Sequence, residues 1–304
     1  MSIRKTVRFD YFKVYSRKYN EEEQKIEELP CDLSDVFTHL KNIPTSERIY
    51  RIGGDEARLQ GLNFENDKWE LHFVRIRKNG FPIITHDDGS YTYMDELEDE
   101  QGLGEEVSAI YDPENFVIMI RRNMNSLAPS AISNYITNVI NTQGYTVIFN
   151  PLIHPMAKSL LKKEHLIRGA EVKIGDIKSA RNRTKMSLGR MVNDVDNIEE
   201  TVSMYLKIGI QNKGSKKNSK LPLYDELEEL IEDPEVESVK VRRKADEDAK
   251  VEHIDLIKHR LVDYHTFTKD DFHKKSRNIL HETVILNMYK QYNRRLDEIN
   301  TVYK

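Results

Sequence analysis

Apolar and polar residues alternate along several stretches of the first 125 residues, as expected for strands that bury one face. The pattern predicts, in chain order, a strand at 6–15, a helix at 33–40, a hairpin at 57–78 and a second hairpin at 106–123. The second hairpin has Pro113 and Asn115 in its turn, where these residue types are favoured. The N-terminal region is therefore predicted to be mostly antiparallel sheet.

After residue 126 the apolar period lengthens from two to nearly four, and residues 126–144 predict a helix ended by Gly144. Strands and helices then alternate. The strands are predicted at 145–149, 170–174, 201–210, 238–243 and 253–264, and the helices at 156–163, 184–195 and 223–232. Thr268 and Asp271 next have the spacing of a capping box, and nothing interrupts a helix from Asp270 to Tyr303.

We therefore predict an α+β protein, with an antiparallel N-terminal sheet carrying one helix and a C-terminal mixed α/β half that ends in a long helix. The predicted domains are an antiparallel β-rich domain at 1–125, a mixed α/β domain at 126–267 and the long C-terminal helix at 268–304. That helix would run about 45 Å. It either supports the whole body or pairs with a second copy, and we predict a homodimer.

Composition narrows the class of protein. The 304 residues include 47 basic and 51 acidic side chains, a formal net charge of −4, so any phosphate binding needs a local basic patch. The single cysteine, Cys31, excludes an internal disulfide and any multi-cysteine zinc site. The opening MSIRKTVRFDY has no apolar run of a signal peptide, and no window predicts membrane insertion. A cytoplasmic location is expected.

Two basic stretches lack acidic residues, KSARNRTKMSLGR and QNKGSKKNSK. Cations that converge without carboxylates to neutralise them are what phosphate binding requires, although lysine-rich loops also serve solubility alone. The candidate nucleic-acid-binding residues in these stretches are Lys178, Arg181, Arg183, Lys185, Arg190, Lys213, Lys216 and Lys217.

Arg121 and Arg122 are further candidates because they follow a buried strand and precede a helix, a common position for ligand contacts. Two interpretations remain open for them: a solvated strand end, or the edge of a binding surface.

Catalytic signals are weaker. Glu171 and Lys173 on a predicted strand have the spacing of half a metal-dependent nuclease site, but alternating charge on a half-exposed strand explains them more simply. His253, His259 and His265 form no zinc pattern. No catalytic residue, metal ligand or cofactor is predicted, and whether the protein is an enzyme stays open.

Four short motifs carry a resemblance: Gly104-Glu105-Glu106, Tyr111-Asp112, Arg122-Asn123 and Pro129-Ser130. Together they resemble a family of uncharacterised bacterial proteins that is linked to mobile elements and phage defence. The order of elements is loosely similar to the DNA-binding component of the Kiwa defence system and to a lambdoid phage-exclusion protein. The resemblance implies a defence-associated protein that binds nucleic acid, with DNA favoured.

The sequence therefore predicts non-catalytic nucleic-acid binding through a local basic patch. The alternatives are a metal-dependent nuclease that uses Glu171 and Lys173, and an interaction module that senses or inhibits a phage or host protein.

Overall fold

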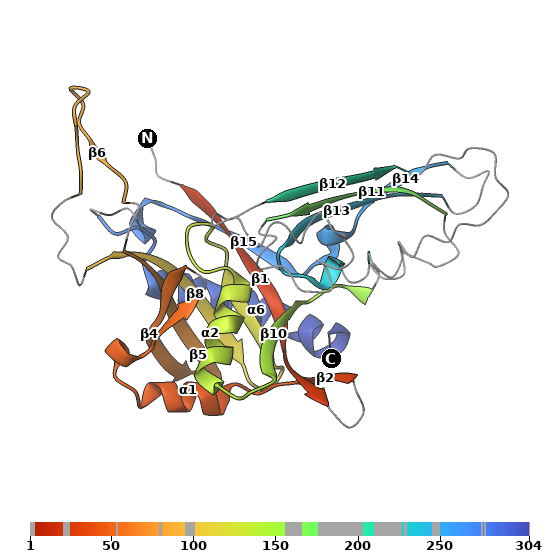
Figure 1. Cartoon of the computed structure of the whole chain (residues 1–304), viewed down its shortest axis with the longest axis horizontal. Coiled ribbons are helices and arrows are strands. Elements are labelled where there is room, and N and C mark those ends of the chain that lie inside the picture. The colour runs from red at the N-terminus through yellow and green to blue at the C-terminus, as the bar shows by residue number, and fades with distance from the viewer. Residues whose placement is uncertain are drawn as a thin grey trace. The chain divides into compact units, whose positions relative to one another are not determined.

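The protein was analysed as a computed structural model (Figure 1). The structure describes residues 4–20, 25–52, 54–78, 81–94, 101–155, 166–175, 203–209, 227, 230–244, 250–274, 276 and 278–303. The chain forms two compact units. The first comprises Met1–Phe9, Val14–Ile148 and Asp263–Arg294, and the second Asp10–Lys13, Phe149–Val262 and Arg295–Lys304.

The described elements are mostly strands, with α-helices and short 3-10 turns (η) between them. In chain order they are β1 (Lys5–Asn20), β2 (Lys25–Pro30), α1 (Ser34–Lys41), η1 (Thr45–Glu47), β3 (Ile49–Ile52), β4 (Asp55–Glu65), β5 (Lys68–Arg77), β6 (Ile84–Thr85), β7 (Tyr91–Thr92), β8 (Leu103–Asp112), β9 (Val117–Arg121), α2 (Pro129–Ile140), β10 (Tyr145–Pro151), β11 (Leu166–Ile174), β12 (Met204–Gly209), β13 (Val236–Lys244), β14 (Glu252–Asp255), η4 (Leu256–His259), β15 (Val262–Phe267), η5 (Lys269–Asp271) and α6 (His281–Val302). The predicted combination of helices with antiparallel strands is confirmed at this level.

The largest sheet has the strand order β10-β1-β9-β8-β5-β4-β3, and β2 and β15 also pair with β1. Both hairpins predicted from the sequence are present in it, as β4–β5 and β8–β9. Asn66 and Asp67 have positive φ angles of 50° and 59°, the conformation that a two-residue hairpin turn requires. Local turn chemistry thus determines this register.

One face of β5 and β8 packs against α1 and α2 through aromatic rings. The Phe37 ring centroid lies 5.6 Å from that of Trp69 and 5.7 Å from that of Tyr111. Tyr135 on α2 lies 5.4 Å from Phe73 in an edge-to-face arrangement. Such pairs add to the burial of apolar area and fix the two helices on the sheet.

The opposite face of these strands is covered by α6. Val284, Met288 and Tyr292 are fully buried, whereas Leu286 is 62% exposed. The Tyr292 hydroxyl donates a hydrogen bond of 2.7 Å to Oδ2 of the buried Asp112. This part of the helix therefore serves as a structural support for the first unit.

The predicted start of the C-terminal helix at Asp270 is wrong, because α6 begins at His281. The capping box itself exists: the Thr268 backbone N–H donates to Asp271 Oδ2 at 2.7 Å. It caps only the 3-10 turn η5, after which Phe272 and Ile279 form an isolated antiparallel bridge. Pairing across this short loop displaces the first turns of the expected helix.

The second unit contains an antiparallel sheet with the strand order β12-β11-β13-β14. Its core includes Val172, Val239, Val241 and Leu256, all nearly or fully buried. The helices predicted at 156–163 and 184–195 and most of the one at 223–232 lie outside the described residues.

Arg260 holds one end of this unit together. It is 9% exposed, and its guanidinium donates to three backbone carbonyls, those of Val236 at 2.9 Å, Ile231 at 2.8 Å and Asp233 at 2.7 Å. Among the helices that the structure describes, none is both long and apolar enough to cross a membrane.

Candidate functional site

Most of the basic residues singled out from the sequence lie outside the described residues. These are Lys178, Arg181, Arg183, Lys185, Arg190, Lys213, Lys216 and Lys217. The structure therefore places only Arg121 and Arg122 of that set.

Arg121, the last residue of β9, is directed into the first unit and is 5% exposed. Burial lowers the pKa of its guanidinium, and the carboxylate of Glu106 opposes that shift. Arg122 is half-buried, and its backbone N–H donates to the carbonyl of Arg8 at 2.8 Å. Arg121 is therefore buried in the first unit, and Arg122 is bonded to a neighbouring strand through its backbone.

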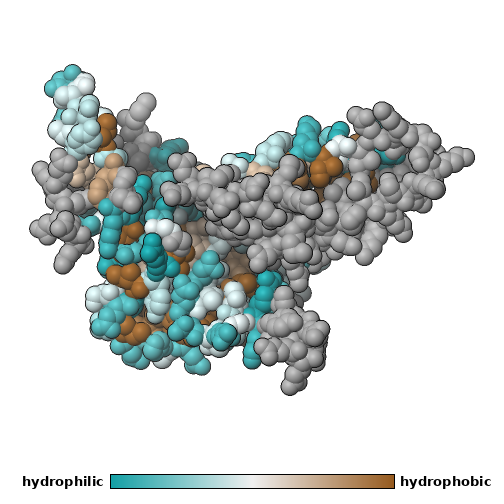
Figure 2. Space-filling view, viewed as in Figure 1, coloured by the Kyte–Doolittle hydropathy of each residue, from teal (hydrophilic) through white to brown (hydrophobic). Residues whose placement is uncertain are grey.

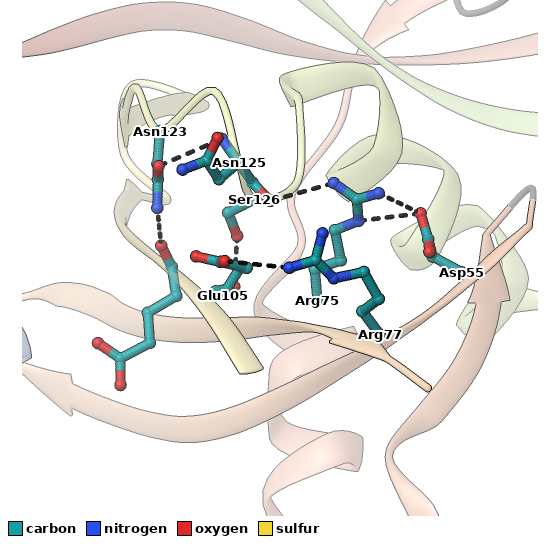
Figure 3. Close-up of polar contacts among 8 residues, drawn as sticks. Asp55, Arg75, Arg77, Glu105, Asn123, Asn125 and Ser126 are labelled. Atoms are coloured by element: carbon teal, nitrogen blue, oxygen red, sulfur yellow. Dashed lines mark hydrogen bonds and ion pairs between the residues drawn. The ribbon is translucent and has the colours of Figure 1, made fainter. Parts of the chain in front are cut away.

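The loop that follows β9 is fastened to the start of β8 (Figure 3). The Asn123 side-chain amide donates to the backbone carbonyl of Glu106 at 2.8 Å, and the Ser126 hydroxyl donates to that of Glu105 at 2.5 Å. The Asn125 backbone N–H in turn donates to Asn123 Oδ1 at 3.3 Å. The polar side chains of Asn123 and Ser126 thus donate to backbone carbonyls of β8.

Two arginines of β5 make polar contacts at this place, Arg75 with the loop and Arg77 with β8, as Figure 3 also shows. Arg75 is 2.7 Å from Asp55 Oδ2 and donates to the Asn125 carbonyl at 3.1 Å. Arg77 lies 3.9 Å from a carboxylate oxygen of Glu105. The arrangement fixes the crossing from β9 to α2.

A buried polar cluster lies beneath the start of α6, and it brings together His72, Glu106, Ser108, Arg121 and His281. The imidazole rings of His72 and His281 stack with centroids 4.1 Å apart and an interplanar angle of 10°. The hydroxyl of Ser108 is 2.8 Å from His281 Nδ1, and His72 Nε2 is 3.6 Å from Glu106 Oε1.

Electrostatics keep His281 neutral. Burial, followed by repulsion from His72, lowers the pKa of His281 to about 3. The interaction with His72 lowers the pKa of Glu106, so this carboxylate is ionised.

A serine beside a histidine is the beginning of a nucleophilic site, but Ser108 is only 1% exposed. The serine hydroxyl is thus closed to a substrate, and the buried polar cluster anchors α6 to the sheet.

The second unit presents a different surface, the side of the four-stranded sheet that faces away from its core. Alternation along each strand and the observed pairing, such as Glu171 with both Lys207 and Lys240, assign side chains to this side. We call it the outer face, and its members are Gly169, Glu171, Lys173, Tyr205, Lys207, Gly209, Ser238, Lys240, Arg242, Lys244, His253 and Asp255.

One aromatic side chain of the outer face, that of Tyr205, is exposed to solvent. Tyr205 is 64% exposed, and the side chains of Lys207 and Lys173 are 62% and 52% exposed. Glu171 links two of them, since its carboxylate lies 2.7 Å from Lys207 Nζ and accepts a hydrogen bond of 3.0 Å from the Tyr205 hydroxyl. These contacts lower the pKa of Glu171 and raise those of Lys207 and Tyr205. The tyrosine is therefore a neutral donor to Glu171 beside a charged lysine.

Two paired glycines make room for Arg242 on the same face. Gly169 pairs with both Gly209 and Arg242 across the sheet. A Cβ atom at Gly169 would lie 2.6 Å from Arg242 Nη2 and 2.5 Å from the Ile208 carbonyl oxygen. The guanidinium thus occupies the space that a side chain at position 169 would need, and its Nη2 lies 3.7 Å from the Cβ position of Gly209.

Cations outnumber carboxylates on the outer face. Lys173, Lys207, Lys240, Arg242 and Lys244 belong to it, against Glu171, Asp255 and the nearby Glu237, which lies 2.6 Å from Lys173. Sequence reasoning missed this surface. The strict alternation of MYLKIG was its only signal, because it puts Tyr205 and Lys207 on one side.

The two residues of the nuclease alternative each contact another residue. Glu171 is engaged by Lys207 and Tyr205, and Lys173 by Glu237. Across the described ranges, no group of three histidine, cysteine or acidic side chains is positioned to hold a metal ion.

A second exposed feature is the β6–β7 hairpin of the first unit. Ile83, Ile84, Tyr91 and Tyr93 are between 45% and 65% exposed, and Figure 2 shows hydrophobic atoms at the base of this hairpin. Exposed apolar side chains grouped in this way are more typical of protein contacts than of phosphate contacts.

Comparison with known proteins assigns a family but no activity. No curated protein matches the chain. The model of DUF6731, a family of unknown function, matches residues 2–300, and the chain belongs to that family.

Proposed function

We propose that this protein binds nucleic acid without cleaving it, and that the outer face makes the contacts. The observation that carries the proposal is Tyr205, exposed on a sheet surface that also carries Lys207 on the same strand and Lys240 and Arg242 on β13, two strands away. Cations of this kind bind phosphates, and an exposed ring stacks on a base. Neither role requires the protein to carry a large positive net charge.

The remaining parts of the proposal rest on the sequence. The basic residues Lys178, Arg181, Arg183, Lys185, Arg190, Lys213, Lys216 and Lys217 stay candidates for further phosphate contacts on the basis of the sequence. We further propose a cytoplasmic homodimer that takes part in phage defence and binds DNA. The buried position of Arg121 means that this residue supports the fold rather than the ligand.

The test is a titration of fluorescently labelled oligonucleotides with the wild type and a double variant, Lys240→Glu with Arg242→Glu. Reversing two cations should lower the affinity by at least about tenfold and flatten the dependence on salt. The matched control is Lys258→Glu, an exposed lysine on η4, whose neighbour Leu256 belongs to the core on the other side of the sheet. Equal effects of the two changes, or no binding by the wild type, would refute the proposal.

A protein-interaction module is the second candidate, and the apolar β6–β7 hairpin favours it. Purified protein that carries a protein partner and lacks nucleic-acid absorbance would put this candidate first. Cleavage of DNA or RNA with magnesium, abolished by Glu171→Ala, would instead support the nuclease alternative.

A further inference from the structure

We infer that the outer face selects single-stranded over double-stranded nucleic acid, a conclusion that rests on the proposed function. Its basis is the position of Tyr205 relative to Lys207, Arg242 and the glycine pair Gly169–Gly209. Each of these features suits an unpaired strand lying along β12.

A duplex offers no free base face to a sheet surface. It encloses its base faces in the stack, so an exposed ring gains no stacking contact from it. An open sheet surface with outward side chains also differs from the single helix or two-stranded ribbon that fits a major groove. A single strand presents free base faces, which can stack on Tyr205.

Lys207 provides a cation beside the ring, because it follows Tyr205 on the same side of β12. It is paired with Glu171 at 2.7 Å, but its side chain is 62% exposed, so its ammonium can also contact an anion from the solvent side. A phosphate of the bound strand supplies that anion.

The length of β12 and the glycine at its end also suit a short single strand. From Tyr205 to Gly209 the strand advances by about 14 Å. That distance suits two or three unstacked nucleotides, the number that comparable four-stranded sheets bind. Gly209 leaves the end of this path without a side chain, and Arg242 Nη2 lies 3.7 Å from its Cβ position, so a cation is close to the backbone of the ligand there.

The experiment compares a labelled single strand with the duplex of the same sequence, on the full chain. The wild type should bind the single strand at least about tenfold more tightly. Tyr205→Ala should remove about ten- to thirtyfold of that affinity and leave the salt dependence unchanged, since no charge is lost. Tyr205→Phe keeps the ring and should retain binding within about twofold. Tyr264→Ala is the matched control, because Tyr264 is 59% exposed on β15.

The outcomes distinguish a failure of the proposed function from a failure of strand selection alone. If the wild type binds neither ligand, the proposed function fails. If it binds both equally, or binds the duplex more tightly, nucleic-acid binding stands and strand selection is overturned. A loss in Tyr205→Phe as large as in Tyr205→Ala would also overturn the stacking contact, because only the hydroxyl differs. Circular dichroism of each variant establishes that the exposed substitutions leave the fold intact.

Discussion

The sheet of the first unit and the sheet of the second place their polar side chains differently. Strands β5 and β8 are covered on one side by α1 and α2 and on the other by α6, so Ser108 and Asp112 between them are buried and hydrogen-bonded to residues of α6. The β12-β11-β13-β14 sheet packs apolar residues on one side only, and its other side carries exposed lysines and a tyrosine.

This difference between the two sheets separates residues that stabilise the fold from residues that are free to bind a ligand. The stacked pair of His72 and His281 in the first unit follows from the packing of α6 on the sheet, although His72 Nε2 has no hydrogen-bond partner among the described residues. Such packing does not account for Tyr205, which is largely exposed. We therefore expect substitutions under α6 to affect folding, and substitutions on the outer face to affect ligand affinity.

The largest expected effect is at Asp112. This carboxylate is 2% exposed and accepts hydrogen bonds from the Asn115 amide at 3.1 Å and the Tyr292 hydroxyl at 2.7 Å, with Lys68 3.9 Å away. Asp112→Ala leaves these donors buried without their acceptor and should reduce the free energy of unfolding by about 3 kcal/mol, measured by urea denaturation. The exposed Asp270→Ala should cost less than about 0.5 kcal/mol. Equal losses would contradict the assignment.

A smaller effect is expected from pH through His281. The folded protein keeps this imidazole neutral down to about pH 3, whereas the unfolded chain takes up a proton below the ordinary value of 6.5. The contribution of His281 to stability is thus fully present above pH 6.5 and is lost as the pH falls toward 3. Between about pH 7 and pH 5 the loss should be about 1–2 kcal/mol.

The measurement that isolates this contribution is the pH dependence of unfolding in the wild type and in His281→Gln. Ser108, His72, Glu106 and Arg121 all face the ring and remain in both proteins. The wild-type curve should therefore be steeper below pH 6.5. Parallel curves would show that His281 is not the group that titrates.

The smallest effect is expected on the outer face. Lys173→Ala removes an ion pair of 2.6 Å with Glu237, but the lysine side chain is 52% exposed. Water and salt screen such a pair, so the free energy of unfolding should change by less than about 0.5 kcal/mol in the same urea assay. A loss comparable to that of Asp112→Ala would mean that the outer face supports the fold and would remove the contrast between the sheets.

Features set by neighbouring residues were predictable from the sequence. The turn at Asn66 and Asp67 and the turn after Asp112 were placed correctly, because both residue types tolerate or favour turn geometry. The capping box of Thr268 and Asp271 was also found. What it caps could not be inferred, since the bridge between Phe272 and Ile279 competes with the helix that the local pattern favours.

The positions of side chains on faces depended on residues far along the chain. From the sequence, the side chain of Arg121 could be either solvated or part of a binding surface at the end of its strand. In the structure it is 5% exposed and lies near His281, a residue far along the chain. The alternation around Tyr205 indicated two sides of a strand, but not which side would be covered. The sequence therefore predicted that the middle of the chain holds cations for binding, and it did not identify this surface.

The three carbonyls that receive the Arg260 guanidinium carry a consequence for sequence variation in the family. A lysine ends in a single compact ammonium group and cannot span acceptors that a planar fork reaches together. Relatives that retain this arrangement should keep arginine here, even where they exchange Arg and Lys freely on exposed positions. Position 260 can thus serve as a marker when distant members of the family are aligned.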